Sequence, residues 1–304
     1  FVLDWNASSN LISIAERENF LVRAEAAANR AYLLDPDNAL ALAFYAEVLL
    51  DQQKWDQARQ YAEQAVALAP DLMDTHRVLA TVLESIGAYR DAIQEYMLAA
   101  EITPNLTFLY LRIGLVYRHL QIYNTALEYF ERAAVINEQL DVQDPLPYIA
   151  IAKTYAQQGE FFIAARNGEK ALSFDPTNAD TYGQLGMIYV QARNYETALP
   201  TLRCAVEGCS AEENETALLF VEEGILTSSV AVEPLELTNL TVAYYYVRYG
   251  SVLAYLDGED HSYCQRSLAL MDVLRSAFPE DELLMQNVED NEATCYSLMG
   301  VTAP

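Results

Sequence analysis

The chain has 304 residues, of which 52% are hydrophobic, so it can bury a sizeable core and is not intrinsically disordered. Its 44 acidic residues against 18 basic ones give a formal net charge of -26, which argues against nucleic acid or anionic lipid as a partner because both repel negative charge. No apolar run of about 18 residues occurs, so we expect no membrane-spanning segment.

Residues 1–38 are predicted to form an N-terminal arm and a partial repeat. Alanines at helical spacing, Ala24, Ala28 and Ala31, predict a helix over Glu16–Leu34. The chain does not begin with methionine, which suggests that upstream residues were removed, and a cleaved export signal is one explanation.

An internal repeat of 34 residues occupies residues 39–140. Three sets of residues recur at this spacing: Ala58, Ala92 and Ala126; Ala65, Ala99 and Ala133; and Pro36, Pro70 and Pro104. Alanine lets two helices approach closely, and proline cannot continue a helix. Each period therefore predicts a pair of short antiparallel helices, and this segment contains three such pairs.

The repeat resumes, after a slip in phase, in residues 141–212. Two pairs of alanines are again 34 residues apart, Ala164 with Ala198 and Ala171 with Ala205. Two further helix pairs are predicted here. The tyrosines and phenylalanines of these units recur at helical spacing, so we interpret them as core residues.

The ordered pattern of aromatic residues, a hairpin glycine, two alanines and a closing proline resembles the tetratricopeptide repeat family over residues 39–212. The resemblance implies an all-α fold, a right-handed superhelical solenoid of antiparallel helix pairs whose first helices line a concave groove. It also implies that the chain docks proteins or peptides. The sequence has no phosphate-binding glycine loop, nucleophile elbow or zinc-protease helix, so we expect neither enzyme activity nor a cofactor.

The pattern lapses in an insert at residues 213–239. Its segment Thr216–Val232 is rich in Val, Leu, Ile, Thr and Ser, which is compatible with either a short β-hairpin or an irregular loop. Residues 240–304 are predicted to form a divergent helical hairpin and a C-terminal capping helix. The expected helices are Leu240–Leu256, His261–Phe278 and Glu280–Met299.

The four cysteines suit two disulfides, with free buried thiols as the alternative. Cys204 and Cys209 are five residues apart, and Cys264 and Cys295 fall in neighbouring predicted helices. They lack the close double pairing of a zinc site, so no metal is expected.

Four sequons for N-glycosylation are present, although some arise by chance. They begin at Asn6, Asn105, Asn214 and Asn239. Together with the expected disulfides, they favour an extracellular or otherwise extracytoplasmic location, with the cytoplasm as the alternative.

The first helices of the repeats carry a group of cations where the resemblance places the concave groove. These are Arg77, Arg112, Arg118, His119 and Lys153. Because the chain has few cations, their grouping predicts an adaptor that binds an acidic peptide. The alternative interpretation is that they pair with neighbouring carboxylates of the chain itself.

Both ends of the sequence are apolar, which is unusual because a free solenoid needs polar capping units. The candidate self-association residues are Phe1, Val2, Leu3, Trp5, Leu298, Met299 and Val301. If one end fits the other, copies join head to tail into a ring, filament or tube. Our first hypothesis is an exported, self-assembling scaffold. Arms that fold back onto their own repeats are the alternative.

Overall fold

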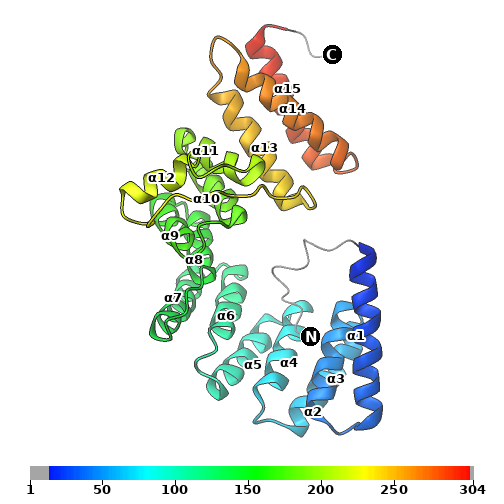
Figure 1. Ribbon diagram of the computed structural model, residues 1–304. Coiled ribbons are helices and arrows are strands. Elements are labelled where there is room, and N and C mark those ends of the chain that lie inside the picture. Colours follow the sequence, from blue (N-terminus) through cyan, green and yellow to red (C-terminus); the bar gives the residue numbers. More distant parts are fainter. Residues whose placement is uncertain (1–13, 302–304) are drawn as a thin grey trace. The chain divides into compact units, whose positions relative to one another are not determined.

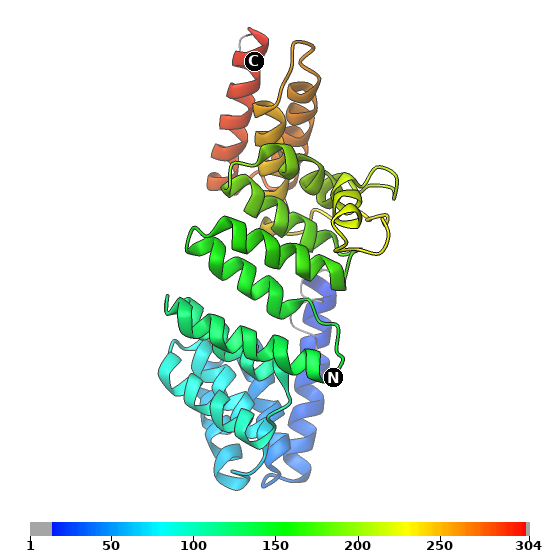
Figure 2. The same ribbon diagram turned by 90° about the vertical axis from the view of Figure 1, so that its left-hand side faces the viewer.

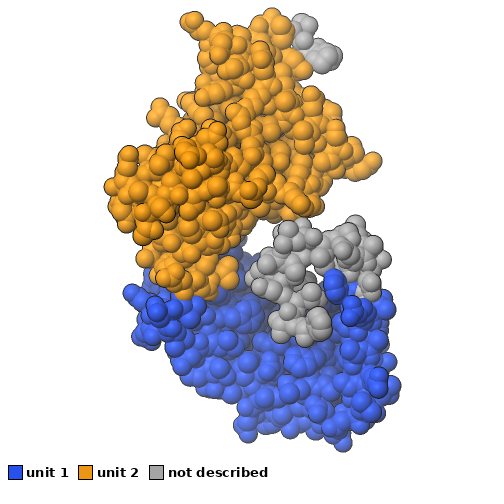
Figure 3. Space-filling model, in the orientation of Figure 1, with its two compact units in different colours: residues 1–142 blue, residues 143–304 orange. Residues whose placement is uncertain are grey.

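The computed structural model describes residues 14–301, which form fifteen α-helices and one isolated β-bridge. The predicted all-α fold of helix pairs is therefore confirmed. The chain divides into two compact units, unit 1 (Phe1–Val142) and unit 2 (Gln143–Pro304), which Figure 3 colours separately.

Unit 1 consists of a long first helix followed by three helix pairs, α2 with α3, α4 with α5 and α6 with α7 (Figure 1). Its helices are α1 (Ile14–Leu34), α2 (Ala39–Asp51), α3 (Trp55–Leu68), α4 (Met73–Ser85), α5 (Tyr89–Ile102), α6 (Thr107–His119) and α7 (Tyr123–Gln139). The first-helix partner expected for α1 lies mostly outside the described residues.

The turn inside each helix pair requires one residue in the left-handed region of φ. Gly87 supplies it between α4 and α5, with φ at 81°. Gln53 and Gln121 take the same place in the other two pairs of unit 1, with φ at 60° and 61°. A glycine at this place is thus favourable but not required, because the packing of the two helices fixes the turn.

The recurring alanines form the contact between paired helices. All six alanines of the 34-residue period in unit 1 are fully buried. Gly114 of α6 serves the same purpose, because the ring of Phe130 in α7 lies where a Cβ atom would be. Small residues are needed at these places because interiors are packed without spare volume.

Unit 2 contains two more helix pairs, a short helix and a group of three helices. Its helices are α8 (Leu146–Gln157), α9 (Phe161–Phe174), α10 (Ala179–Gln191), α11 (Tyr195–Glu207), α12 (Glu215–Glu222), α13 (Leu240–Tyr255), α14 (Ser262–Ala277) and α15 (Glu282–Met299). Helices α13, α14 and α15 pack side by side (Figures 1 and 2). The Tyr245 hydroxyl of α13 donates to the Asp180 carboxylate of α10 at 2.9 Å, which joins this group to the repeats.

Of the two structures predicted for the insert, the hairpin is wrong, and the irregular loop is right only outside a short helix. Residues 215–222 form helix α12, and the rest of the insert is irregular apart from a single bridge between Cys209 and Val232. Asn214 caps the helix by accepting a hydrogen bond from the Ala217 amide at 3.0 Å. The buried residues Thr216, Ala217 and Phe220 follow helical spacing, and this burial outweighs the β-propensity of the segment.

Both cysteine pairs form disulfides, and none of the four cysteines is free. The Cα atoms of Cys204 and Cys209 are 4.9 Å apart, and those of Cys264 and Cys295 are 5.1 Å apart. The second disulfide is fully buried and ties α14 to α15. Within residues 14–301, no helix combines the length and apolar character that a bilayer crossing requires.

Candidate functional site

Ion pairs connect the first helices of the three repeats in unit 1. Arg77 of α4 donates to Glu47 of α2 at 2.6 Å and to Asp74 of its own helix at 3.2 Å. Arg112 of α6 donates to Glu84 of α4 at 2.6 Å. The facing sides of α2, α4 and α6 therefore form one continuous surface.

We call this surface the inner face. It is built from residues that share one side of each helix by their spacing of three or four. They are Leu40, Phe44 and Glu47 of α2, Asp74, Arg77, Thr81 and Glu84 of α4, and Phe108, Arg112 and Leu115 of α6.

A buried tyrosine supports the ion pair between α4 and α6. The Tyr96 hydroxyl donates to Glu84 at 2.9 Å, accepts from Arg112 Nε at 3.2 Å and lies 3.1 Å from the Thr81 hydroxyl. Burial raises the pKa of Tyr96 to about 12, so the hydroxyl stays protonated and remains a donor. Burial by itself lowers the pKa of Arg112, but Tyr96 and Glu84 together raise it above its ordinary value. Arg112 is thus held by the chain itself.

The structure separates the five predicted groove cations into distinct environments. Arg77 and Arg112 bind carboxylates of the chain itself. Arg118 differs, because its Nη1 is buried without an acceptor among the described residues, and its guanidinium lies 5.9 Å from the ring centre of Phe130. His119 is exposed, with its ring 4.6 Å from that of Tyr89. Lys153 is an exposed residue of α8 and belongs to unit 2.

Sequence reasoning missed the apolar part of the inner face. Phe44 and Phe108 are 42% and 40% exposed, and Leu40 is similarly accessible. A signal was present in the repeat, since Leu40 and Phe108 each lie one period from Asp74, where a solvated surface would carry polar residues. Exposed aromatic side chains are typical anchors for a bound protein segment.

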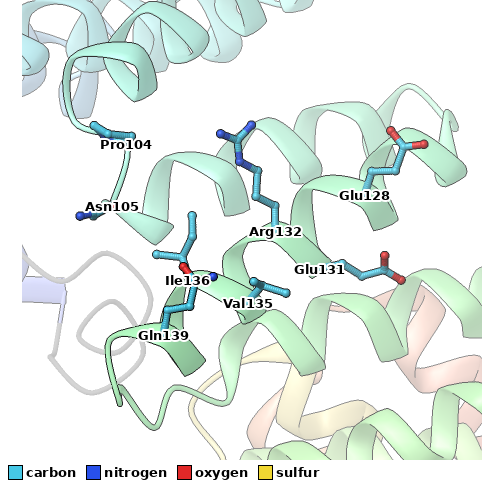
Figure 4. Close-up of a pocket in the computed structure, with 8 residues that line it drawn as sticks. All are labelled: Pro104, Asn105, Glu128, Glu131, Arg132, Val135, Ile136 and Gln139. Atoms are coloured by element: carbon cyan, nitrogen blue, oxygen red, sulfur yellow. The ribbon is translucent and has the colours of Figure 1, made fainter.

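A shallow hollow of about 560 Å³ lies on α7 of unit 1 (Figure 4). Its lining residues are Pro104, Asn105, Glu128, Glu131, Arg132, Val135, Ile136 and Gln139. The Arg132 guanidinium packs over the Tyr110 ring at 4.4 Å. Figure 4 shows the two glutamates directed apart rather than converging on one point. The described residues contain no group of His, Cys, Asp or Glu arranged to hold a metal ion.

The sequons differ in accessibility. Asn105 is exposed, whereas Asn239 is half-buried and caps α13 by accepting from the Val242 amide. The expectation of a glycan at Asn214 is incompatible with the folded chain, because this side chain is fully buried and donates to Tyr182 and to the Val230 carbonyl, both at 2.9 Å. Asn6 lies outside the described residues.

Only the C-terminal candidates for self-association lie within the described residues. Leu298 and Val301 are exposed, whereas Met299 packs beside the disulfide between Cys264 and Cys295. The N-terminal candidates Phe1, Val2, Leu3 and Trp5 lie outside the described residues.

Comparison with known proteins identifies two stretches of the chain. Residues 109–139 and residues 168–199 each match a family model described as tetratricopeptide repeat. No curated protein sequence matches the chain.

Solved structures resemble the chain over most of its length. A tetratricopeptide repeat protein from Parabacteroides merdae has a TM-score of 0.56 at 16% identity, over 92% of this chain and 93% of that one. PilF of Pseudomonas aeruginosa has a TM-score of 0.55 at 14% identity, over 83% and 96%. A chain of the APC/C hetero-tetramer Cut9-Hcn1 has a TM-score of 0.59 at 16% identity, over 89% of this chain but only 46% of that one. At such identities the likeness is one of fold.

Proposed function

Because this chain is a tetratricopeptide repeat protein, we propose that it is a non-catalytic scaffold that binds a segment of another protein on the inner face of unit 1. The observation that carries the proposal is the pair of exposed phenylalanines, Phe44 and Phe108, on a face whose charges are already paired. Apolar side chains that remain exposed beside ion pairs of the chain itself can be buried by a bound partner segment.

The geometry of the inner face limits the length of the segment. Packed helices lie about 8–10 Å apart. Helices α4 and α6 are not closely packed and are joined through Arg112, so the anchors on α2 and α6 are separated by at least about 16–20 Å. An extended chain needs at least about five or six residues at about 3.3 Å each to cover this distance. The ion pairs through Arg77 and Arg112 hold the three helices in place before the partner arrives, which reduces the ordering cost of binding.

The paired arginines change the adaptor hypothesis. An acidic peptide that bound Arg77 or Arg112 would have to displace Glu47 or Glu84 from contacts of 2.6 Å. The displaced carboxylates would then lose their partners, so little binding energy would result. Apolar anchoring is therefore the primary mode that we propose.

Changing Phe44 and Phe108 together to serine is expected to weaken peptide binding at least about tenfold, because aromatic anchors dominate such interfaces. The peptides used are those that the wild-type chain selects from a random library of peptides about twelve residues long. Thermal unfolding is expected to change little, since both rings are already well exposed. Phe162→Ser is the matched control, because this ring is 81% exposed on α9 of unit 2. Equal affinities for the double variant and the wild type would contradict the inner face as the binding surface.

Self-association is a second candidate, supported by exposed leucines on α1. Leu33 and Leu34 are 71% and 77% exposed, and Leu298 and Val301 are accessible beyond the core of unit 2. If the first surface covers the second in another copy, the contact is head to tail and gives a ring or filament. Light scattering should then show a mass that grows with concentration, and changing both α1 leucines to serine should abolish the growth. A constant monomer mass would refute this candidate.

We also propose an extracytoplasmic location. Disulfides persist in oxidising compartments and are rare in the cytosol of mesophiles. The two cysteine pairs of unit 2 and the exposed sequon at Asn105 support this proposal.

A further inference from the structure

A hydrogen bond fastens the first helix of a repeat to the end of the repeat before it. In the third repeat, the Tyr110 hydroxyl of α6 donates to the Pro104 carbonyl at 2.9 Å. His76 of α4 lies one period of 34 residues before Tyr110, and its Nε2 is 2.8 Å from the Pro70 carbonyl oxygen. The second repeat therefore makes the same contact with a ring that can gain or lose a proton.

The second ring nitrogen of His76 meets a carboxylate. Its Nδ1 lies 2.6 Å from Oε2 of Glu95 on α5. The side chains of His76 and Glu95 are only 7% and 21% exposed, so water competes little for this contact. One buried ring thus joins α4, α5 and the loop that ends the first repeat.

The groups around the ring decide its protonation. A carbonyl oxygen can only accept, so Nε2 must carry a hydrogen to bind Pro70. An ionised carboxylate also can only accept, so Nδ1 must carry one to bind Glu95. A neutral imidazole has a single N–H and would turn the lone pair of Nδ1 towards the carboxylate. The geometry therefore requires the charged ring, with both nitrogens protonated.

The charges on the neighbouring elements favour the same form. They are Asp74 and Arg77 on α4, Asp71 in the loop before it, Asp91 on α5, and Arg59 and Glu63 on α3. Both arginines are bound to other carboxylates, Arg77 to Glu47 and Asp74 and Arg59 to Glu63. Within residues 14–301, His76 is the only cation that binds Glu95. The remaining charge is negative, and negative surroundings favour the charged form of histidine.

We propose that His76, Glu95 and the Pro70 carbonyl form a proton-dependent clamp that stabilises the second repeat at mildly acidic pH. A histidine of the unfolded chain loses its second ring proton near about pH 6.5. Above this pH the folded chain therefore binds one proton more than the unfolded chain, so its stability falls as the pH rises. One proton corresponds to a folding equilibrium constant about tenfold lower per pH unit. The clamp contributes fully below about pH 6 and progressively less above it.

The clamp acts on the helix that carries the centre of the inner face. Helix α4 contributes Asp74, Arg77, Thr81 and Glu84 to that face. The clamp therefore sets the pH range in which this part of the face is held most firmly. It goes beyond the proposed function and requires no partner, so it can be tested on the chain alone.

Two substitutions remove the titrating contact in different ways. His76→Tyr reproduces the arrangement of Tyr110 and keeps a donor for the Pro70 carbonyl. Glu95→Gln supplies an amide donor to Nδ1, so a neutral ring is sufficient. Between about pH 6.5 and pH 8.5, the wild type should lose stability relative to either variant by about tenfold in the folding equilibrium constant per pH unit. His119→Gln, which replaces an exposed histidine of α6, should behave as the wild type does.

Hydrogen exchange locates the effect in the second repeat. Protection of the α4 and α5 amides should fall with rising pH relative to that of the α10 amides, after correction for the intrinsic exchange rate. Helix α10 is the internal reference, because the Tyr182 hydroxyl makes the equivalent bond to the Pro176 carbonyl at 3.1 Å, and burial raises the pKa of this tyrosine. An equal pH dependence in α10 would assign the change to the net charge of the chain and overturn the clamp.

Nitrogen NMR of the three histidine rings tests the protonation directly and does not depend on the folding of a variant. At about pH 7.5, both ring nitrogens of His76 should carry hydrogen, whereas the exposed His119 should be neutral. A neutral His76 at this pH would overturn the proposal. A wild-type pH dependence that persists in both His76→Tyr and Glu95→Gln would do the same. Failure of peptides to bind the inner face would contradict the proposed function and leave these results unchanged.

Discussion

Changing Cys264 and Cys295 together to alanine is expected to lower the free energy of unfolding of unit 2 by about 4 kcal/mol, because the disulfide closes a loop of about thirty residues. The bond joins α14 to α15, and Met299 and Leu268 pack around it. Hydrogen exchange should show the loss most strongly in the amides of these two helices. Denaturant unfolding measures the change in the free energy of unfolding.

The other disulfide is the matched control. Cys204 and Cys209 are separated by only five residues, so changing both to alanine is expected to cost about 2 kcal/mol. Under reducing conditions, the wild-type chain should lose stability around both disulfides. Equal effects of the two double variants, or no effect on α14 and α15, would contradict the assignment of the larger role to the bond between Cys264 and Cys295.

Asn214→Ala is expected to cost about 3 kcal/mol, because one fully buried side chain makes three hydrogen bonds. It caps α12 through the Ala217 amide and connects the insert to α10 through the Tyr182 hydroxyl. It also holds the loop that follows α12, through the Val230 carbonyl. Without it, buried polar groups of all three segments lose a partner. Hydrogen exchange of the α12 amides should accelerate before that of α10.

Asn239→Ala provides the control for the capping contribution. Asn239 caps α13 with one hydrogen bond to the Val242 amide and is half-buried, so its loss is expected to cost about 1 kcal/mol. A similar cost for the two asparagines would show that Asn214 acts as an ordinary cap.

The repeats could be predicted because their signal is local and periodic. Alanine at Ala58, Ala92 and Ala126 reports a contact that only small side chains permit, and the structure buries all three completely. The insert could not be predicted in the same way. Asn214 is a residue type favoured as a helix cap, but α12 also depends on the burial of Phe220 and on the hydrogen bonds of Asn214 to the Tyr182 hydroxyl and the Val230 carbonyl, and these are tertiary contacts.

The arginines of the candidate site could be predicted from the sequence, but their ion pairing could not. The sequence showed that Arg77, Arg112 and Arg118 lie in first helices of the second and third repeats. It could not show that Glu47 and Glu84 satisfy two of them, because those carboxylates are 30 and 28 residues away. Only packing of successive helices brings such groups within hydrogen-bonding distance.

The sequence by itself determined the helix pairs, since a period of 34 residues with small side chains at fixed places is compatible with little else. The tertiary structure decided which charges pair within the chain. Arg112 and Arg118 are similar residues on one helix, but the first is enclosed by Glu84 and Tyr96 and the second faces Phe130. The physical reason is that the pairing of a charge depends on neighbours across the helix interface, and these are distant along the chain.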